Sequence, residues 1–137
     1  MGRPPSGRGV VLDASAVVAL ANSERGRNTV MRELRRRPAA LSAVTLAELY
    51  ALERQGRIAP DWRQRLHYEG VEVRVFEEKD ARSTGEIWPE CRHLAGGLGD
   101  RATLALARRL QWAAVTTDAP WRTVAERLGV ELVLAPR

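Results

Sequence analysis

Four acidic residues stand at points in the sequence where their side chains could act together. They are Asp13, Glu48, Asp100 and Asp118. Four carboxylates in one place repel one another, by about 1 to 4 kcal/mol for each close pair at ~4 Å. A hard divalent cation such as Mg²⁺ or Mn²⁺ would offset that repulsion, because such ions prefer carboxylate and water oxygens as ligands.

A site of this kind suits hydrolysis of a phosphodiester bond. The metal lowers the pKa of a bound water, and one or two ions stabilise charge on the attacking and leaving oxygens. Two hydroxyl residues, Ser15 and Thr117, lie close enough in sequence to an acid to hold a carboxylate or a metal-bound water. Cys91 is the only cysteine, and His67 and His93 provide no zinc pattern with it. Any metal is therefore expected to be held mainly by oxygen.

Each acid also has a purely structural interpretation. Asp13, Asp100 and Asp118 each stand where a residue could cap the N-terminus of a helix, and for Asp100 and Asp118 taken singly this interpretation is as strong as the ligand one. Glu48 alone would be an ordinary half-exposed helix residue. The occurrence of all four together favours a shared site.

The pattern of apolar residues predicts the elements that position these acids. Strands are expected at 9–12, 71–76, 113–116 and 131–134, and helices at 15–21, 24–37, 45–52, 60–69, 79–94, 100–110 and 121–128. Pro89 should kink or interrupt the helical segment that contains it. Strands separated by helices indicate a parallel sheet with right-handed crossovers. Functional groups gather beyond the C-terminal ends of such strands, where Asp13 and Asp118 are expected.

Length and composition indicate a small globular protein. The 137 residues suit one domain, expected at 9–137, preceded by a flexible basic tail at 1–8. No window approaches the roughly 18 unbroken apolar residues of a membrane-spanning helix. The apolar run after the tail breaks at Asp13, too early for a signal peptide, so a cytoplasmic protein is expected.

The net charge of +5 favours an anionic partner, with nucleic acid the leading candidate. An alternative explanation is coding bias, because Lys79 is the only lysine among the 22 basic residues and GC-rich coding favours arginine. The densest basic run is Arg35, Arg36 and Arg37, for which a solvated helix end is the default interpretation.

Four segments resemble, in order and in approximate spacing, the successive motifs of PIN-domain proteins. They are VLDASA at 11–16, TLAEL at 45–49, LGDRATLALA at 98–107 and TTDAPW at 116–121. The resemblance spans about residues 9 to 135. The chain length and the LGDRA element are similar, more narrowly, to a VapC-type toxin of a bacterial or archaeal toxin–antitoxin pair.

This resemblance implies a three-layer α/β/α sandwich with a central, mainly parallel sheet. It also implies a Mg²⁺- or Mn²⁺-dependent endoribonuclease that acts on structured RNA such as tRNA or ribosomal RNA, forms a homodimer and is inhibited by a cognate antitoxin. The family pattern gives catalytic roles to the core acids Asp13, Glu48 and Asp100 and to the more variable Asp118, and accessory roles to the hydroxyls of Ser15 and Thr117. The expected metal ligands are Asp13, Asp100 and Asp118.

Three other classes of protein share some of these features. A phosphoacceptor receiver domain needs neighbouring acids after its first strand and a lysine at a late strand end, where Lys79 does not lie. A haloacid-dehalogenase phosphatase needs Asp-x-Asp, but this chain has Asp13-Ala14-Ser15. A catalytically silent RNA-binding or scaffold module is the main alternative, since the arginines allow it. The presence of all four acids argues against it.

Overall fold

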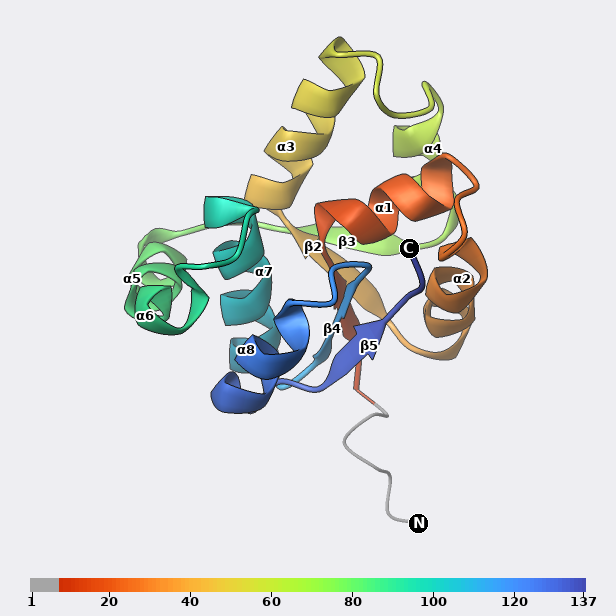
Figure 1. The fold of residues 1–137 in the computed structure, drawn as a ribbon. Helices are drawn as coiled ribbons and strands as arrows, with labels where there is room; N and C mark the ends of the chain where they lie inside the picture. Colours follow the sequence, from red (N-terminus) through yellow and green to blue (C-terminus); the bar gives the residue numbers. More distant parts are fainter. Residues whose placement is uncertain (1–7) are drawn as a thin grey trace.

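The computed structural model describes residues 8–137, which form one five-stranded sheet flanked by helices (Figure 1). All of the strand pairs are parallel, and the order across the sheet is β3-β2-β1-β4-β5. The strands are β1 (Val10–Leu12), β2 (Ala39–Ser42), β3 (Val71–Arg74), β4 (Ala113–Thr116) and β5 (Leu132–Leu134). The tail expected at 1–8 lies outside the described residues, apart from Arg8.

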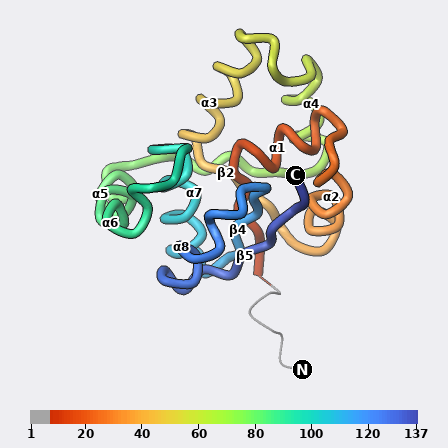
Figure 2. Tube along the Cα trace, viewed as in Figure 1, coloured from red at the N-terminus to blue at the C-terminus, as the bar shows by residue number. Residues whose placement is uncertain are grey.

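Helices cover both faces of the sheet, so the expected three-layer α/β/α architecture with a parallel sheet is confirmed (Figures 1 and 2). One face packs against α1 (Ala14–Ala21), α2 (Arg27–Arg36), α3 (Ala43–Arg54) and α4 (Trp62–Tyr68), and the other against α5 (Glu78–Glu86), α6 (Trp88–Cys91), α7 (Gly97–Leu110) and α8 (Trp121–Leu128).

Alternation along the central strand produces two separate hydrophobic cores. Val10 and Leu12 of β1 point into the core that α1 to α4 share, whereas Val11 points into the core beneath α5 to α8. All residues of β1, β2 and β4 are buried, as expected for parallel strands covered on both faces. The largest fully buried side chain in each core is a tryptophan, Trp62 in the first and Trp121 in the second.

Strand β2 was not predicted from the sequence. Its residues, Ala-Ala-Leu-Ser, have no β-branched or aromatic member, and they become a strand because β1 and β3 pair with them on either side. Helix α7 begins at Gly97, three residues before the expected start. The expected interruption near Pro89 is confirmed, because α5 ends at Glu86 and α6 starts at Trp88.

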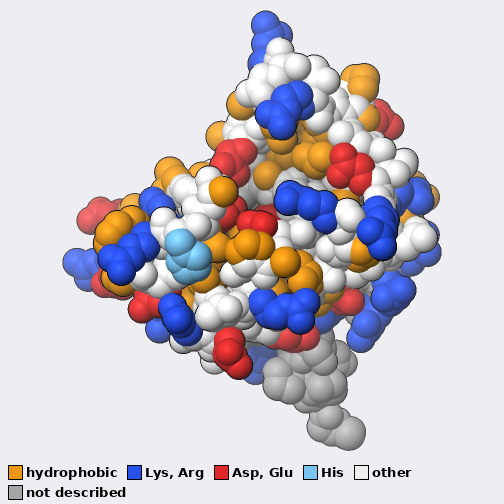
Figure 3. All heavy atoms as spheres, viewed as in Figure 1, with side chains coloured by type: hydrophobic (Ala, Val, Ile, Leu, Met, Phe, Trp, Pro, Cys, Tyr) orange, Lys and Arg blue, Asp and Glu red, His pale blue; other side chains and the backbone are white. Residues whose placement is uncertain are grey.

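Within residues 8–137, no helix is long and apolar enough to cross a membrane. The face viewed in Figure 3 instead mixes charged, polar and apolar side chains around a central hollow.

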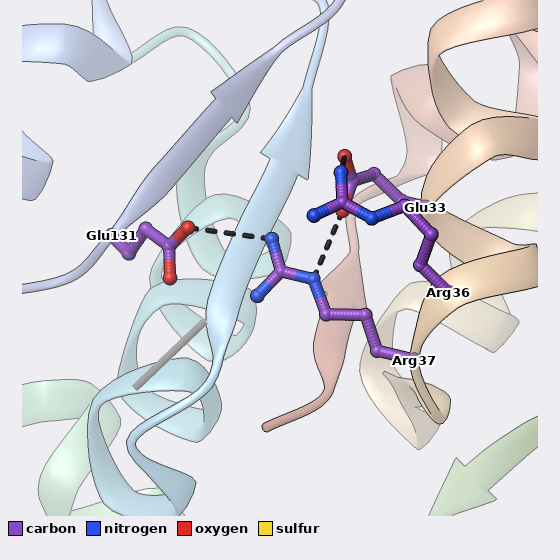
Figure 4. A network of polar contacts seen from close by, with 4 residues as sticks. All are labelled: Glu33, Arg36, Arg37 and Glu131. Atoms are coloured by element: carbon purple, nitrogen blue, oxygen red, sulfur yellow. Dashed lines mark hydrogen bonds and ion pairs between the residues drawn. The ribbon is translucent and has the colours of Figure 1, made fainter. Parts of the chain in front are cut away.

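A buried ion pair joins the end of α2 to the residue before β5 (Figure 4). Arg37 Nε donates a hydrogen bond of 2.9 Å to Glu33 Oε1, and Arg37 Nη2 donates one of 3.3 Å to Glu131 Oε2. The side chains of Arg37 and Glu33 are only 4% and 6% exposed. Because a buried charge is stable only when paired, removing one partner should be costly.

We expect Arg37→Met to lower the free energy of unfolding by about 3 kcal/mol, since it removes the nearer and buried one of the two cations that pair with the Glu33 carboxylate. Arg36→Met is the matched control, because the Arg36 side chain is 57% exposed and lies 3.5 Å from the same carboxylate. Chemical denaturation of the two variants measures the difference. Equal stability of the two would contradict a structural role for the buried pair.

Candidate active site

A cleft of about 620 Å³ is lined by residues that follow β1 and β4, at the C-terminal edge of the sheet. The four acids singled out from the sequence, Asp13, Glu48, Asp100 and Asp118, all line it. They come from four places: the end of β1, helix α3, the first turn of α7 and the loop after β4. Acidic side chains accordingly appear in red in the central hollow of Figure 3.

Asp13 is held in place by three hydrogen-bond donors. The backbone N–H of Ala16 donates to Oδ1 at 2.8 Å, the Thr116 hydroxyl donates to Oδ2 at 2.6 Å, and the Ser15 hydroxyl lies 2.7 and 2.9 Å from the two oxygens. The side chain therefore does cap α1, as its structural interpretation predicted. Burial nevertheless raises the pKa of Asp13 to about 6, against the lowering effect of these bonds.

Glu48 lies on α3 and is only half-buried, but its pKa is raised to about 7. Burial contributes most to this rise, and the negative charges of Asp100 and Asp13 add to it. Within residues 8–137, the Glu48 carboxylate accepts no hydrogen bond that would stabilise its charge. Its environment thus holds a proton near neutral pH, which is unusual for a helix glutamate.

Asp100 and Asp118 complete the acidic lining of the cleft. Asp100 lies in the first turn of α7 and accepts a 3.1 Å hydrogen bond from the backbone N–H of Gly96. Burial is the main cause that raises the pKa of Asp100, and the charge of Asp118 raises it further. Asp118 does not cap α8, whose N-terminal flanking residue is Pro120 and has no side-chain cap.

The glycines before Asp100, at the N-terminal end of α7, lie close to two of the acids. A Cβ atom on Gly99 would overlap the carboxylate of Glu48, and one on Gly96 would overlap the carboxylate of Asp100. Gly97, between them, has a φ of +59°, which favours glycine. These glycines therefore leave the space into which the two side chains turn.

Thr116 is the supporting residue that sequence analysis missed. Sequence proximity pointed to the hydroxyl of Thr117, but Thr117 contributes its backbone N–H, which donates to the Ser15 hydroxyl at 3.0 Å. Thr116 reaches Asp13 because the parallel register pairs Leu12 with Val115. The pairing of β1 with β4 was the only signal that could have identified it. Two arginines at the cleft, Arg57 and Arg137, were also not singled out.

The donor set of the cleft fits a hard divalent cation. All four acids supply oxygen. Burial and, after it, repulsion from Asp100 and Asp13 raise the pKa of Glu48, and a cation in the cleft would relieve that repulsion. Within the described part of the chain, no three His, Cys, Asp or Glu side chains are close enough to form a direct ligand group. Mg²⁺ is usually bound through one or two carboxylates and keeps several waters, so it does not require such a group.

Fold and cleft together describe an α/β protein with an acidic site at the C-terminal edge of a parallel sheet. The sequence model of the PIN domain matches residues 10–127, and the chain therefore belongs to the PIN-domain family. No curated protein matches the sequence significantly.

Solved structures share this fold at low sequence identity. The chain is similar to VapBC2 from Rickettsia felis, solved bound to a DNA fragment from its promoter, with a TM-score of 0.65, 19% identity, and coverage of 92% of this chain and 98% of that one. The chain is also similar to a toxin–antitoxin complex from Klebsiella pneumoniae, with a TM-score of 0.64 and 18% identity. The match covers 91% of this chain and 96% of that one. A PilT N-terminus domain protein from Sulfolobus solfataricus matches with a TM-score of 0.56 and 18% identity, over 91% of this chain and 85% of that one.

The metal-free protein should lose stability as the pH rises from about 4 to about 7. Asp13 and Glu48 bind protons more tightly in the folded chain, where their pKa values rise from 3.8 to about 6 and from 4.5 to about 7. Their contribution is thus fully present below about pH 4 and is lost as the pH passes through the folded values. Thermal unfolding in EDTA across this range measures the effect.

Glu48→Gln should make that decline shallower and raise the metal-free melting temperature at about pH 8, by roughly 3 °C per kcal/mol of repulsion removed. Glu126→Gln, an exposed change on α8, is the control that should leave the profile unaltered. A Glu48→Gln profile that superimposes on the parent profile would show that Glu48 does not share a charged cleft with the other acids.

Gly99→Ala should displace the Glu48 carboxylate at little expense to the fold, because the atom in the way is the end of a flexible side chain. Gly85→Ala is the matched control: it is also a helical glycine, and a Cβ there meets nothing within 4 Å. We expect Gly99→Ala to reduce the rise in melting temperature that Mn²⁺ produces, whereas Gly85→Ala should retain it. An equal response of both variants to Mn²⁺ would refute this role for Gly99.

Proposed function

We propose that this protein is a Mg²⁺- or Mn²⁺-dependent endoribonuclease that acts in the cytoplasm as the toxin of a VapC-type toxin–antitoxin pair. The observation that carries the proposal is the convergence of four carboxylates in one cleft of a PIN-domain fold. Supporting evidence comes from the solved structures of similar fold, two of which are a VapBC and a toxin–antitoxin complex.

Asp13, Asp100 and Asp118 are the proposed metal ligands. Asp13 is fixed by its three donors, yet an ionised carboxylate has about four lone-pair positions, so one remains for a cation. A divalent ion bound there supplies positive charge to the phosphate oxygens and lowers the pKa of water. Ser15 and Thr117 are proposed as accessory residues, because together they form part of the hydrogen-bonded support of Asp13.

Glu48 is the proposed proton acceptor. It has no hydrogen-bond partner within residues 8–137, and its pKa of about 7 in the metal-free cleft is close to the working pH. A carboxylate with these properties can take the proton of an attacking water and later release it, which is general base catalysis. Its side chain enters the cleft from α3, and its carboxylate lies against Gly99 at the start of α7.

The proposed substrate is a structured RNA of the tRNA or ribosomal RNA class. Its phosphates would meet Arg57 and Arg137, which line the cleft beside the acids and supply positive charge. A cognate antitoxin is the proposed inhibitor, with a tail that enters the same cleft, and the toxin is proposed to act as a homodimer.

The alternative function is a catalytically silent RNA-binding or scaffold module of the same fold. The net charge of +5 supports RNA binding in either case. The two functions differ only in whether the acids perform chemistry. A variant that keeps the cleft but loses one acid therefore distinguishes them.

We expect Asp100→Asn to reduce Mg²⁺-dependent cleavage of tRNA or ribosomal RNA by roughly 100-fold or more while leaving RNA binding intact. Asp61→Asn, an exposed change at the start of α4, is the control and should cleave normally. Gel analysis of RNA fragments with Mg²⁺ and with EDTA measures cleavage. Binding of RNA without cleavage by the parent protein would support the silent module instead.

A further inference from the structure

We propose that the outer face of α2, together with Arg25 and Arg137, forms a track that holds the phosphate backbone of the RNA substrate as it leaves the acidic cleft. This inference rests on the proposed ribonuclease function and adds the surface that binds the substrate. We call this surface the α2 track. It is defined by Arg25, Arg27, Arg32, Arg35, Arg36 and Arg137.

A groove of about 440 Å³ runs along α2. It is lined by Arg27, Asn28, Met31, Arg32, Arg35 and Arg36, so no carboxylate of the described chain lines it. The one acid of the helix, Glu33, is buried and paired with Arg37 on the inner side. The groove is therefore positively charged along its length, which is about 15 Å for ten helical residues.

Internal pairing accounts for Arg36, whose guanidinium lies 3.5 Å from the Glu33 carboxylate, but not for the other arginines of the groove. Arg32 and Arg35 are exposed and form no ion pair with any residue of the described chain. Favourable interaction with the helix dipole explains cations in the last turn, where Arg35 and Arg36 lie, but it does not extend to Arg27 or Arg32. A row of like charges is self-repelling, and a bound polyanion would relieve that repulsion.

The groove is connected to the acidic cleft through the C-terminal segment. Arg137 lines the cleft, and Arg25 Nη1 donates a 3.2 Å hydrogen bond to the Arg137 carbonyl oxygen. Gly26 lies directly between Arg25 and the first groove residue and packs closely against Pro136. Figure 3 shows basic side chains in blue from the central hollow toward α2 at its right.

Nucleic acid suits this surface better than a protein partner does. The planar arginine fork matches phosphate oxygens, and the groove offers several such forks in a row. Protein interfaces instead depend on buried aromatic and aliphatic anchors, whereas Met31 is the only apolar residue that lines the groove. A strand whose scissile phosphate lies in the cleft could therefore continue over Arg137 and Arg25 onto α2.

The test compares Arg32→Gln/Arg35→Gln with Arg82→Gln/Arg127→Gln. Both double variants remove two exposed arginines that have no ion pair in the described chain, and the control pair lies on α5 and α8. Each is made in a Glu48→Gln protein so that binding can be measured without cleavage. Binding of labelled bulk tRNA in Mg²⁺ is followed by fluorescence anisotropy over a range of salt concentrations, and cleavage is measured separately with intact Glu48.

We expect the α2 variant to bind tRNA roughly ten-fold more weakly and to lower the slope of log K against log salt by about 1.4 to 1.8, since each phosphate contact contributes about 0.7 to 0.9. With Glu48 intact, its KM should rise while kcat is retained. The control variant Arg82→Gln/Arg127→Gln should show a slope of log K against log salt close to that of the parent protein.

Three results would overturn the proposal. If the α2 variant and the control show equal slopes of log K against log salt, and the parent protein cleaves RNA, the α2 track is refuted while the ribonuclease function is retained. A parent that neither binds nor cleaves RNA would remove both. The same anisotropy assay with labelled poly-glutamate gives the third result. If the α2 variant binds tRNA as the parent does but loses a binding of poly-glutamate that the parent shows, α2 would be assigned to an acidic protein partner.

Discussion

Carboxylates that share a half-buried cleft repel one another, and the burial that raises their pKa values also strengthens that repulsion. In this protein the constraint is visible at Asp13 and Glu48, whose pKa values rise to about 6 and about 7. Folding alone gains nothing from such an arrangement, because isolated charges are more stable in water. The cleft is therefore a strained site in which a cation would have most to stabilise.

The rest of the fold serves to keep these charges together. The parallel register of β1 and β4 brings the Thr116 hydroxyl to Asp13, and the glycines at 96 and 99 leave room for the other carboxylates. At the far end of the sheet, the buried Arg37 side chain binds both Glu33 of α2 and Glu131, the residue before β5, and so connects the helix to the strand. Helices and strands thus surround the cleft, while Arg32 and Arg35, which form no ion pair within residues 8–137, lie outside it on α2.

Much of the fold follows from local sequence, because strands such as β4 are compact apolar runs and the helices have clear apolar stripes. Strand β2 cannot be predicted from its local sequence, since its alanines become a strand only through pairing with the neighbouring strands. Asp13, Asp100 and Asp118 were identifiable as acids that follow strands or glycines, and Glu48 as the acid of a helical segment. The support of Asp13 by Thr116 was not, because it depends on strand register. The packing of Gly99 against Glu48 likewise depends on how α3 and α7 meet in space.

Binding of Mn²⁺ measured by titration calorimetry in buffers of different ionisation enthalpy tests the shared acidic cleft most directly. Ligands must lose their protons to bind a metal, and Asp13 and Glu48 are partly protonated near pH 6.5 according to their pKa values. The account predicts that Mn²⁺ binding releases protons at about pH 6.5, releases almost none at about pH 8.5 and releases fewer at pH 6.5 in Glu48→Gln. Absence of Mn²⁺ binding, or binding without proton release at the lower pH, would contradict it.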